Sequence, residues 1–111
     1  MELFKKMQNK RMTYLHHIAI QVNDIKTSVN FYQTMFNAEV EYQDETWALL
    51  NVGSQTKLAL VLENEHPKHI CFVTPLVKVY KGTLKEHRDG TKYKYIEDPS
   101  GNVIEMLLEE D

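Results

Sequence analysis

Glu105 is a carboxylate in the middle of an apolar run, VIEMLL at residues 103–108. The preceding DPSGN is a tight-turn sequence, because Pro fixes φ while Gly and Asn tolerate positive φ, so the run after it is predicted to be a buried strand. An ionised group in a core is costly unless it is paired, hydrogen-bonded or bound to a metal. Glu105 is therefore a candidate metal ligand. The alternatives are a satisfied core carboxylate and a strand with one wet face.

Two histidines occupy matching places in an internal repeat. The stretches LHHIAIQV and PKHICFVT align on His17 and His69, which are 52 positions apart. The stretches KLALVLEN and VIEMLLEE align at a separation of 46 positions. The chain is therefore interpreted as two copies of one supersecondary unit, the second of them about six residues shorter.

The repeat predicts a metal site. Equivalent strands of a two-copy β-fold are related by pseudo-symmetry, so we expect His17 and His69 to face each other across one cavity, where Glu105 completes a two-histidine, one-carboxylate set. That set suits one divalent ion, Fe(II), Mn(II), Ni(II) or Zn(II), and leaves positions open for water or substrate. The first-copy equivalent of Glu105 is Ala59, which cannot bind a metal, so the chain offers three protein ligands.

The elements that position these residues follow from the apolar pattern. Residues 14–22 are rich in β-branched side chains and are predicted to form a strand. Asp24 is predicted to cap a helix, whose apolar positions recur every three or four residues and which ends near Asn37. Further strands are expected at residues 38–43, 46–53, 57–64 and 68–74.

The second copy has little room for a helix. Asp89-Gly90 is a strong two-residue hairpin turn, which predicts a hairpin over residues 83–97 that pairs Leu84 with Tyr95. Only residues 75–82 remain, so the second helix is expected to be a single turn or absent. An uncovered apolar sheet face usually finds a partner, which predicts a homodimer.

Length and composition limit the function classes. A chain of 111 residues fits a single domain, predicted at 14–111 with module one at 14–64 and module two at 68–111, after a flexible extension at 1–13. The net charge is −3 and both signs are scattered, so no basic stripe suggests nucleic acid.

Membrane and secretion signals are not recognised in the sequence. No apolar run approaches the roughly 20 residues of a membrane span, and the basic start has no apolar segment behind it to make a signal peptide. The single cysteine, Cys71, permits no intrachain disulfide, which fits a reducing compartment. We therefore expect a cytoplasmic protein that neither spans nor binds a membrane.

A resemblance to a known family is carried by three stretches: LHHIAIQVNDIKTSVNFYQTMFNAEV, KHICFVT and YIEDPSGNVIEML. They resemble the glyoxalase / bleomycin resistance / extradiol dioxygenase superfamily, also called vicinal oxygen chelate, over residues 14–108. The resemblance implies an α+β fold in which two paired βαβββ modules form a cup-shaped mixed sheet around a divalent metal. It implies that His17, His69 and Glu105 are the ligands, and it places the fourth ligand of glyoxalase I-like members on Ala59.

A local likeness to extradiol dioxygenases is carried by the residues His87, Tyr95, Asp98, Pro99, Gly101 and Glu105. Lys85 and Lys94 depart from that pattern. The predicted hairpin register places Tyr95 on the face of Leu84 and turns His87 the other way, so Tyr95 and not His87 is expected to act in catalysis. Gln21 shares the strand face of His17 and is expected to bind substrate.

The resemblance implies an enzyme that uses a divalent metal and acts on a small substrate with vicinal oxygens, as a lyase, an isomerase or epimerase, or a ring-cleaving dioxygenase. The alternative is a metal-free small-molecule binding protein of bleomycin-resistance type, although those proteins lack metal ligands. A sensor that keeps the ligands without turnover is a third hypothesis. A fosfomycin-type thiol transferase uses a similar ligand set but would need a basic cluster for a phosphonate, which the sequence does not display.

Overall fold

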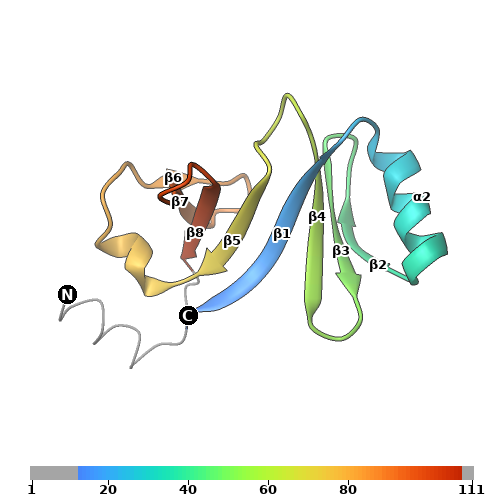
Figure 1. The fold of residues 1–111 in the computed structure, drawn as a ribbon, viewed down its shortest axis with the longest axis horizontal. Coiled ribbons are helices and arrows are strands. Elements are labelled where there is room, and N and C mark those ends of the chain that lie inside the picture. Colours follow the sequence, from blue (N-terminus) through green and yellow to red (C-terminus); the bar gives the residue numbers. More distant parts are fainter. Residues whose placement is uncertain (1–12, 109–111) are drawn as a thin grey trace. The chain divides into compact units, whose positions relative to one another are not determined.

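The computed structural model describes residues 13–108, so the predicted flexible extension lies outside the described residues except for Thr13. The described chain contains one α-helix, one 3-10 helix and eight strands, which makes it an α+β protein (Figure 1). It divides into two compact units. The N-terminal unit is His17–His69, and the described residues of the C-terminal unit are 70–108 together with 13–16.

The N-terminal unit has the order strand, helix and three strands. Its four strands lie in the spatial order β2-β3-β4-β1. The pairs β2–β3 and β3–β4 are antiparallel, whereas β1 runs parallel to β4 because the helix lies in the connection that follows β1. The bounds are β1 Tyr14–Val22, α2 Ile25–Phe36, β2 Glu39–Gln43, β3 Trp47–Val52 and β4 Thr56–Leu62.

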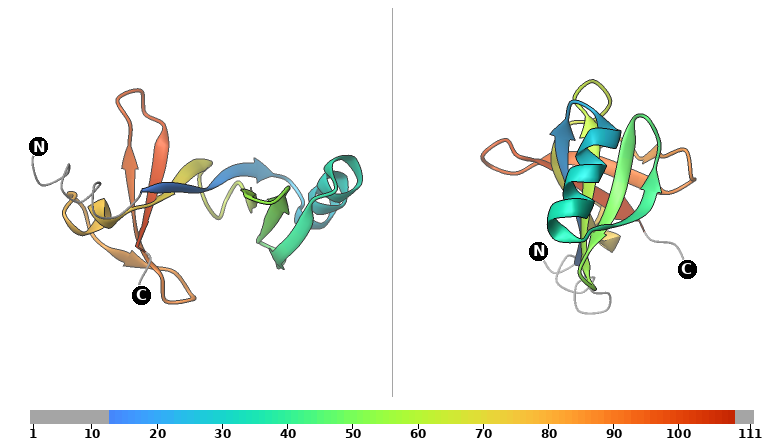
Figure 2. Two further views of the ribbon diagram at one scale, coloured as in Figure 1. Left: turned by 90° about the horizontal axis from the view of Figure 1, so that it is seen from below. Right: turned by 90° about the vertical axis from the view of Figure 1, so that its right-hand side faces the viewer.

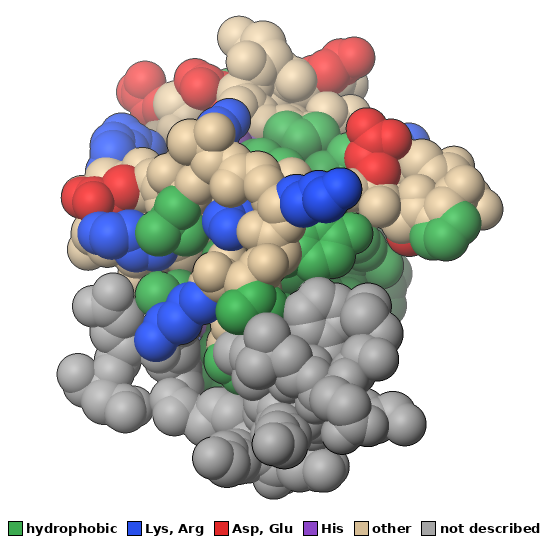
Figure 3. Space-filling model, turned by 90° about the vertical axis from the view of Figure 1, so that its left-hand side faces the viewer, with side chains coloured by type: hydrophobic (Ala, Val, Ile, Leu, Met, Phe, Trp, Pro, Cys, Tyr) green, Lys and Arg blue, Asp and Glu red, His purple; other side chains and the backbone are tan. Residues whose placement is uncertain are grey.

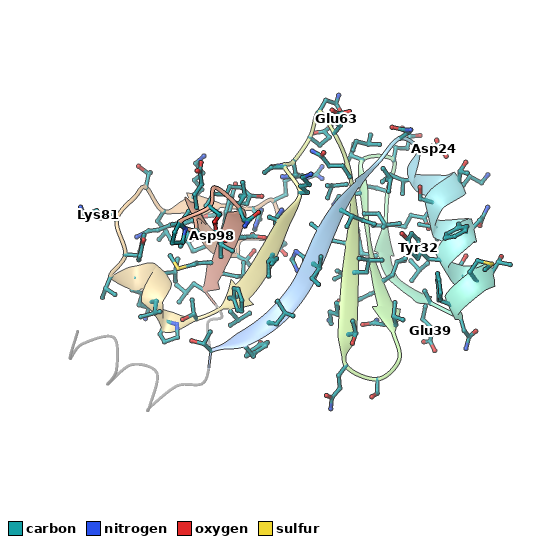
Figure 4. The ribbon with its side chains drawn as sticks, in the orientation of Figure 1. Asp24, Tyr32, Glu39, Glu63, Lys81 and Asp98 are labelled. Atoms are coloured by element: carbon teal, nitrogen blue, oxygen red, sulfur yellow. The ribbon has the colours of Figure 1, made fainter. Side chains whose placement is uncertain are left out.

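Helix α2 begins and ends where its capping residues predict. The Asp24 carboxylate accepts a hydrogen bond from the Thr27 backbone N–H at 2.8 Å, which satisfies one of the helix's unpaired donors. Asn37 is in the left-handed conformation, with φ 57°, and its N–H donates to backbone carbonyls of the last turn. Figure 4 labels Asp24 at the start of the helix. The predicted helix is therefore confirmed at both ends.

Helix α2 covers one face of its sheet (Figure 2). Ile25 and Val29 are buried against that face, and Tyr32 points from the helix toward the strands (Figure 4). Burying a large apolar side chain contributes roughly 1.5–3 kcal/mol, so this layer stabilises the unit. Strand residues packed in the same core are Ile20, Val22, Ala48, Leu50, Val52, Leu58, Leu60 and Leu62.

The opposite face of the same sheet carries smaller side chains. Ala19, Leu49 and Ala59 form a second buried cluster there, with Trp47 packed against it. Side chains alternate between the two faces of a strand, so His17 and Gln21 lie on the face of Ala19, away from α2. The sheet therefore presents its candidate site residues on the face that the helix does not cover.

The C-terminal unit repeats this order without an α-helix. Its strands lie in the spatial order β5-β8-β7-β6, with β5 parallel to β8 and the other pairs antiparallel. The connection after β5 forms only the four-residue 3-10 helix η1, which confirms the predicted loss of the second helix. The bounds are β5 His69–Val73, η1 Pro75–Lys78, β6 Lys85–Glu86, β7 Lys92–Glu97 and β8 Val103–Leu108.

The strand registers confirm the internal repeat. In the N-terminal unit Ala19 lies opposite Ala59 on the parallel strands β1 and β4. In the C-terminal unit Cys71 lies opposite Glu105 on the parallel strands β5 and β8. These two pairs are related by the separations of 52 and 46 positions found in the sequence. The two units are thus copies of one arrangement down to their residue pairing.

The turn before β8 forms as its sequence predicts. Asp98, labelled in Figure 4, accepts hydrogen bonds from the backbone N–H groups of Ser100 and Asn102 and from the Asn102 amide. These bonds lower the pKa of Asp98, with the Asn102 contacts contributing most. Gly101 takes φ 86°, a left-handed conformation that favours glycine. The turn thereby fixes where β8, and with it Glu105, begins.

The predicted register of the β6–β7 hairpin is wrong by one residue. Lys85 lies opposite Tyr93, so the loop has three residues rather than the two of Asp89-Gly90. The His87 N–H donates to the Thr91 carbonyl at 2.8 Å, and the Gly90 N–H donates to the His87 carbonyl at 2.9 Å. Gly90 has φ 91°, as three-residue loops with a glycine bulge require. Both loop types accept Asp-Gly, so that dipeptide did not distinguish them.

The described residues contain no helix that is long and apolar enough to cross a membrane. On the face drawn in Figure 3, Lys and Arg side chains lie interspersed with Asp and Glu side chains. The visible surface therefore carries charge of both signs without one basic stripe.

Candidate functional site

His17 and His69 meet within the N-terminal unit. Their Nε2 atoms are 3.3 Å apart, and their rings lie edge to face at 71°, with centroids separated by 5.4 Å. His69 is buried at 8% exposure and His17 is half-buried. The structure therefore brings together the two histidines that the repeat singles out.

A backbone carbonyl orients His69. Its Nδ1 lies 2.8 Å from the Pro67 carbonyl oxygen, which only accepts, so Nδ1 carries the hydrogen. In a ring that carries this one hydrogen, Nε2 is an acceptor, and the Nε2 of His17 is then the donor of the 3.3 Å contact. Metal-binding histidines are usually held this way, with the second nitrogen bound to a carbonyl or carboxylate that fixes the tautomer.

The spacing of the two nitrogens fits two ligands of one metal ion. Zn–N bonds are about 2.0–2.1 Å long, and two nitrogens 3.3 Å apart on such bonds subtend an angle of about 104–111°. That range includes the tetrahedral angle. An ion would replace the hydrogen that His17 and His69 now share.

Glu105 lies in a row of three side chains that crosses the C-terminal sheet. Its cross-strand neighbours are Cys71 on β5 and Tyr95 on β7. The equivalent row in the N-terminal unit consists of the small or apolar residues Ala19, Ala59 and Leu49. Of these two equivalent rows, the one in the C-terminal unit carries the polar side chains.

The Glu105 carboxylate is buried and held by a hydrogen bond from His87. Its side chain is 4% exposed, and its Oε2 lies 2.6 Å from His87 Nε2. Cys71 lies directly across the strand pair from Glu105. Burial, and after it the charge of Glu105, raises the pKa of the Cys71 thiol far above its ordinary value. Cys71 is therefore a protonated donor and not a thiolate nucleophile.

Tyr95 is a protonated phenol beside Glu105. Burial foremost, followed by the negative charge of Glu105, raises the pKa of the Tyr95 hydroxyl. The same two causes raise the pKa of Tyr93, whose ring meets that of Tyr95 edge to face with centroids 5.3 Å apart. Two phenol rings thus lie near the carboxylate.

His87 is a site residue that the sequence prediction turned away from Glu105. The corrected register places it on the face of Tyr93, and its ring stacks on Tyr93 with centroids 3.7 Å apart and planes 7° from parallel. The extradiol dioxygenase pattern includes His87, but the assumed two-residue turn placed its side chain on the other sheet face.

Gln21 lies at the exposed end of its row on β1. Its amide nitrogen donates to the His66 carbonyl at 3.1 Å, which ties β1 to the loop before β5. Its predicted contact with substrate remains a prediction. Lys94, which departs from the dioxygenase pattern, is buried on the face of β7 opposite Tyr95 and donates to the Tyr80 carbonyl at 2.6 Å.

The candidate ligands therefore come as two preformed parts. The N-terminal unit supplies the oriented pair His17 and His69, and the C-terminal unit supplies the buried Glu105 with His87, Cys71 and Tyr95 around it. The union of the two parts around one ion is a proposal.

Residues 14–76 match the family described as the Glyoxalase/Bleomycin resistance protein/Dioxygenase superfamily. The chain belongs to this superfamily. The chain is also similar to the metallothiol transferase FosB of Staphylococcus epidermidis (strain ATCC 12228 / FDA PCI 1200). It is 27% identical over 117 residues, which cover 86% of this chain and 81% of the relative.

Solved structures share the fold of this superfamily member. A methylmalonyl-CoA epimerase of Streptomyces coelicolor superposes with a TM-score of 0.71 at 17% identity, over 91% of this chain and 100% of the other. A hypothetical protein of Bacillus halodurans C-125 superposes with a TM-score of 0.70 at 17% identity, over 91% and 97% of the two chains. At this identity the likeness establishes the fold alone, and it confirms the predicted glyoxalase-like fold.

Proposed function

We propose that the protein is a divalent-metal-dependent enzyme of the superfamily that acts on a small substrate with vicinal oxygens. The observation that carries the proposal is the His17–His69 pair, whose Nε2 atoms stand at a separation suited to one ion. Glu105, a buried carboxylate on the repeat-equivalent strand pair, would complete the ligand set. Fe(II), Mn(II), Ni(II) and Zn(II) suit two imidazoles and one carboxylate.

The metal, when bound, would supply Lewis-acid chemistry by polarising substrate oxygens and stabilising developing negative charge. The chain's own residues would orient the substrate around it. The protonated Tyr95 hydroxyl would donate a hydrogen bond to a substrate oxygen, and the Gln21 amide would contact the substrate from β1. The Cys71 thiol would serve only as a donor to Glu105, because burial keeps it protonated.

The ligand set restricts the reaction class. A four-ligand site would need a carboxylate or histidine at position 59, where this chain has an alanine buried at 2% exposure. A classical glyoxalase I site is therefore not the expected one. The candidate reactions that remain are those of the superfamily's lyases, isomerases or epimerases, and ring-cleaving dioxygenases. In each of them a metal binds the substrate through neighbouring oxygens.

A second candidate function is metal-dependent transfer of a thiol. The similarity to the metallothiol transferase over 86% of this chain favours it. Cys71 would not be the transferred thiol, because it is buried and protonated, so the thiol would come from a small co-substrate. Lys94 lies on the far face of β7 and binds the Tyr80 carbonyl, so it is not placed to hold an anionic substrate beside Glu105.

The proposal includes a homodimer. The C-terminal unit has a four-residue 3-10 helix where the N-terminal unit has a twelve-residue α-helix, so its sheet is less covered. It exposes the large apolar side chains Ile70, Val79, Tyr80 and Leu84 by 36–43%. Sedimentation equilibrium tests this part. A monomer at concentrations of tens of micromolar would contradict it.

Turnover tests the enzymatic proposal. Chelator-stripped protein is loaded with each of the four metals and incubated with catechols, 2-hydroxy ketones, 2-methyl-branched thioesters, or an epoxide with a thiol, and products are followed by NMR. We expect turnover with one metal and one substrate class, and loss of turnover in His17→Ala and Glu105→Gln. If metal binds without turnover in any class, the protein is a sensor or a binding protein. If no metal binds, the metal-free binding protein becomes the preferred function.

A further inference from the structure

His87 directly holds one oxygen of the Glu105 carboxylate. Its Nε2 lies 2.6 Å from Oε2, a short contact typical of a charge-assisted hydrogen bond. Glu105 is 4% exposed at its side chain and His87 27%, so little water competes for the bond. Loss of this donor would remove a charge-assisted hydrogen bond from a buried carboxylate and so destabilise its charged form.

The hairpin fixes the position of His87. Its N–H and carbonyl make the two backbone hydrogen bonds that close the three-residue loop, to Thr91 and from Gly90. Its ring stacks on Tyr93 with planes 7° apart, which fixes the ring plane. Tyr93 pairs with Leu107 on β8, two residues from Glu105 on the same face. The imidazole is therefore an oriented donor and not a mobile surface side chain.

We propose that His87 is a positioning residue that makes Glu105 a one-oxygen metal ligand, an inference that rests on the proposed metal site. With Oε2 bound to His87, Oε1 would be the oxygen that holds a metal. Two imidazoles and one carboxylate oxygen would leave positions on the ion open for two vicinal oxygens of a substrate. A carboxylate bound through both oxygens would leave fewer positions open.

Two substitutions test the hydrogen bond of His87 and its ring stacking separately. His87→Phe keeps an aromatic ring on Tyr93 and removes the donor. His87→Gln removes the ring and keeps an N–H at a similar reach from the backbone. The probe is Co(II), added to the chelator-stripped full chain, because its visible absorption reports both its affinity and its coordination number.

We expect His87→Phe to weaken Co(II) binding about 10- to 100-fold, as loss of a ligand's hydrogen-bond partner does in other metal sites, and to change the absorption spectrum. His87→Gln should bind within about threefold of the wild type with an unchanged spectrum. Circular dichroism of each metal-free variant shows that it is folded. The proposal is overturned if His87→Phe binds Co(II) as the wild type does, or if His87→Gln is as weak as His87→Phe.

Glu105→Gln distinguishes this proposal from the metal site itself. If Glu105→Gln abolishes Co(II) binding while His87→Phe leaves the affinity and spectrum unchanged, the metal site stands and the positioning role fails. If Glu105→Gln binds Co(II) as the wild type does, Glu105 is not a ligand, and both proposals fail.

Discussion

Cys71 and Glu105 face each other across the parallel strands β5 and β8, at the positions that Ala19 and Ala59 occupy on β1 and β4. Two copies of one strand arrangement have thus acquired different chemistry at the same place. The copy with Ala19 and Ala59 carries no charge at this place, whereas the copy with Glu105 carries a buried carboxylate.

Cys71 is expected to react slowly in the native protein. Its side chain is 0% exposed, and burial and the Glu105 charge raise its pKa, so the reactive thiolate is scarce. Alkylation by iodoacetamide at pH 8, followed by mass spectrometry, should be on the order of 100-fold slower than in urea-unfolded protein. Equal rates in the two states would show that the thiol is accessible.

Tyr95→Phe is expected to lower turnover without lowering metal affinity. The hydroxyl lies beside Glu105, and its raised pKa keeps it a donor. Loss of a donor to a charge that develops during reaction costs about 100-fold in kcat. Turnover and Co(II) titration are measured on the same preparation, with Tyr93→Phe as the matched control. A fall in metal affinity with kcat retained would assign Tyr95 a structural role instead.

Asp44 should make stability depend on pH. The Tyr42 hydroxyl foremost, and the backbone and hydroxyl groups of Thr46 and the Trp47 N–H with it, lower the pKa of Asp44 below its ordinary 3.8. A lowered folded pKa stabilises the protein above the unfolded pKa, and this stabilisation is lost as the pH falls below about 4.

Asp44→Asn isolates this effect, because the amide keeps an acceptor oxygen and loses the charge. Urea unfolding at pH 7, 5 and 3 should give a variant that is less stable at pH 7 and 5, with a smaller difference at pH 3. Acid effects common to both proteins cancel in the comparison. A difference that stays constant across the three pH values would show that the charge of Asp44 contributes nothing.

The elements were predictable because their signals are local. Asp24 and Asn37 mark the ends of α2, and both cap it as predicted. The short second helix follows from the few residues between β5 and the hairpin, which leave room for only one turn. The observed pairing of Cys71 with Glu105 mirrors that of Ala19 with Ala59, at the separations of 52 and 46 positions found in the repeat.

The partner of Glu105 was not predictable in the same way. Arg88-Asp89-Gly90 accepts a two-residue or a three-residue loop, and the choice moves His87 from one sheet face to the other. The apolar pattern of the flanking residues fits both loop lengths, so it does not decide between them. Contacts between residues far apart in the sequence depend on long-range packing, and the periodicity of one strand carries no information about them.

Metal stoichiometry tests the central claim most directly. Chelator-stripped wild-type protein is titrated with Zn(II) and Mn(II) by calorimetry, and the ion content after desalting is measured by mass spectrometry, beside His69→Ala and Glu105→Gln. One ion per chain in the wild type, with binding weakened in both variants, is the predicted result. An absence of binding, or binding that neither variant weakens, would show that these residues do not form a metal site.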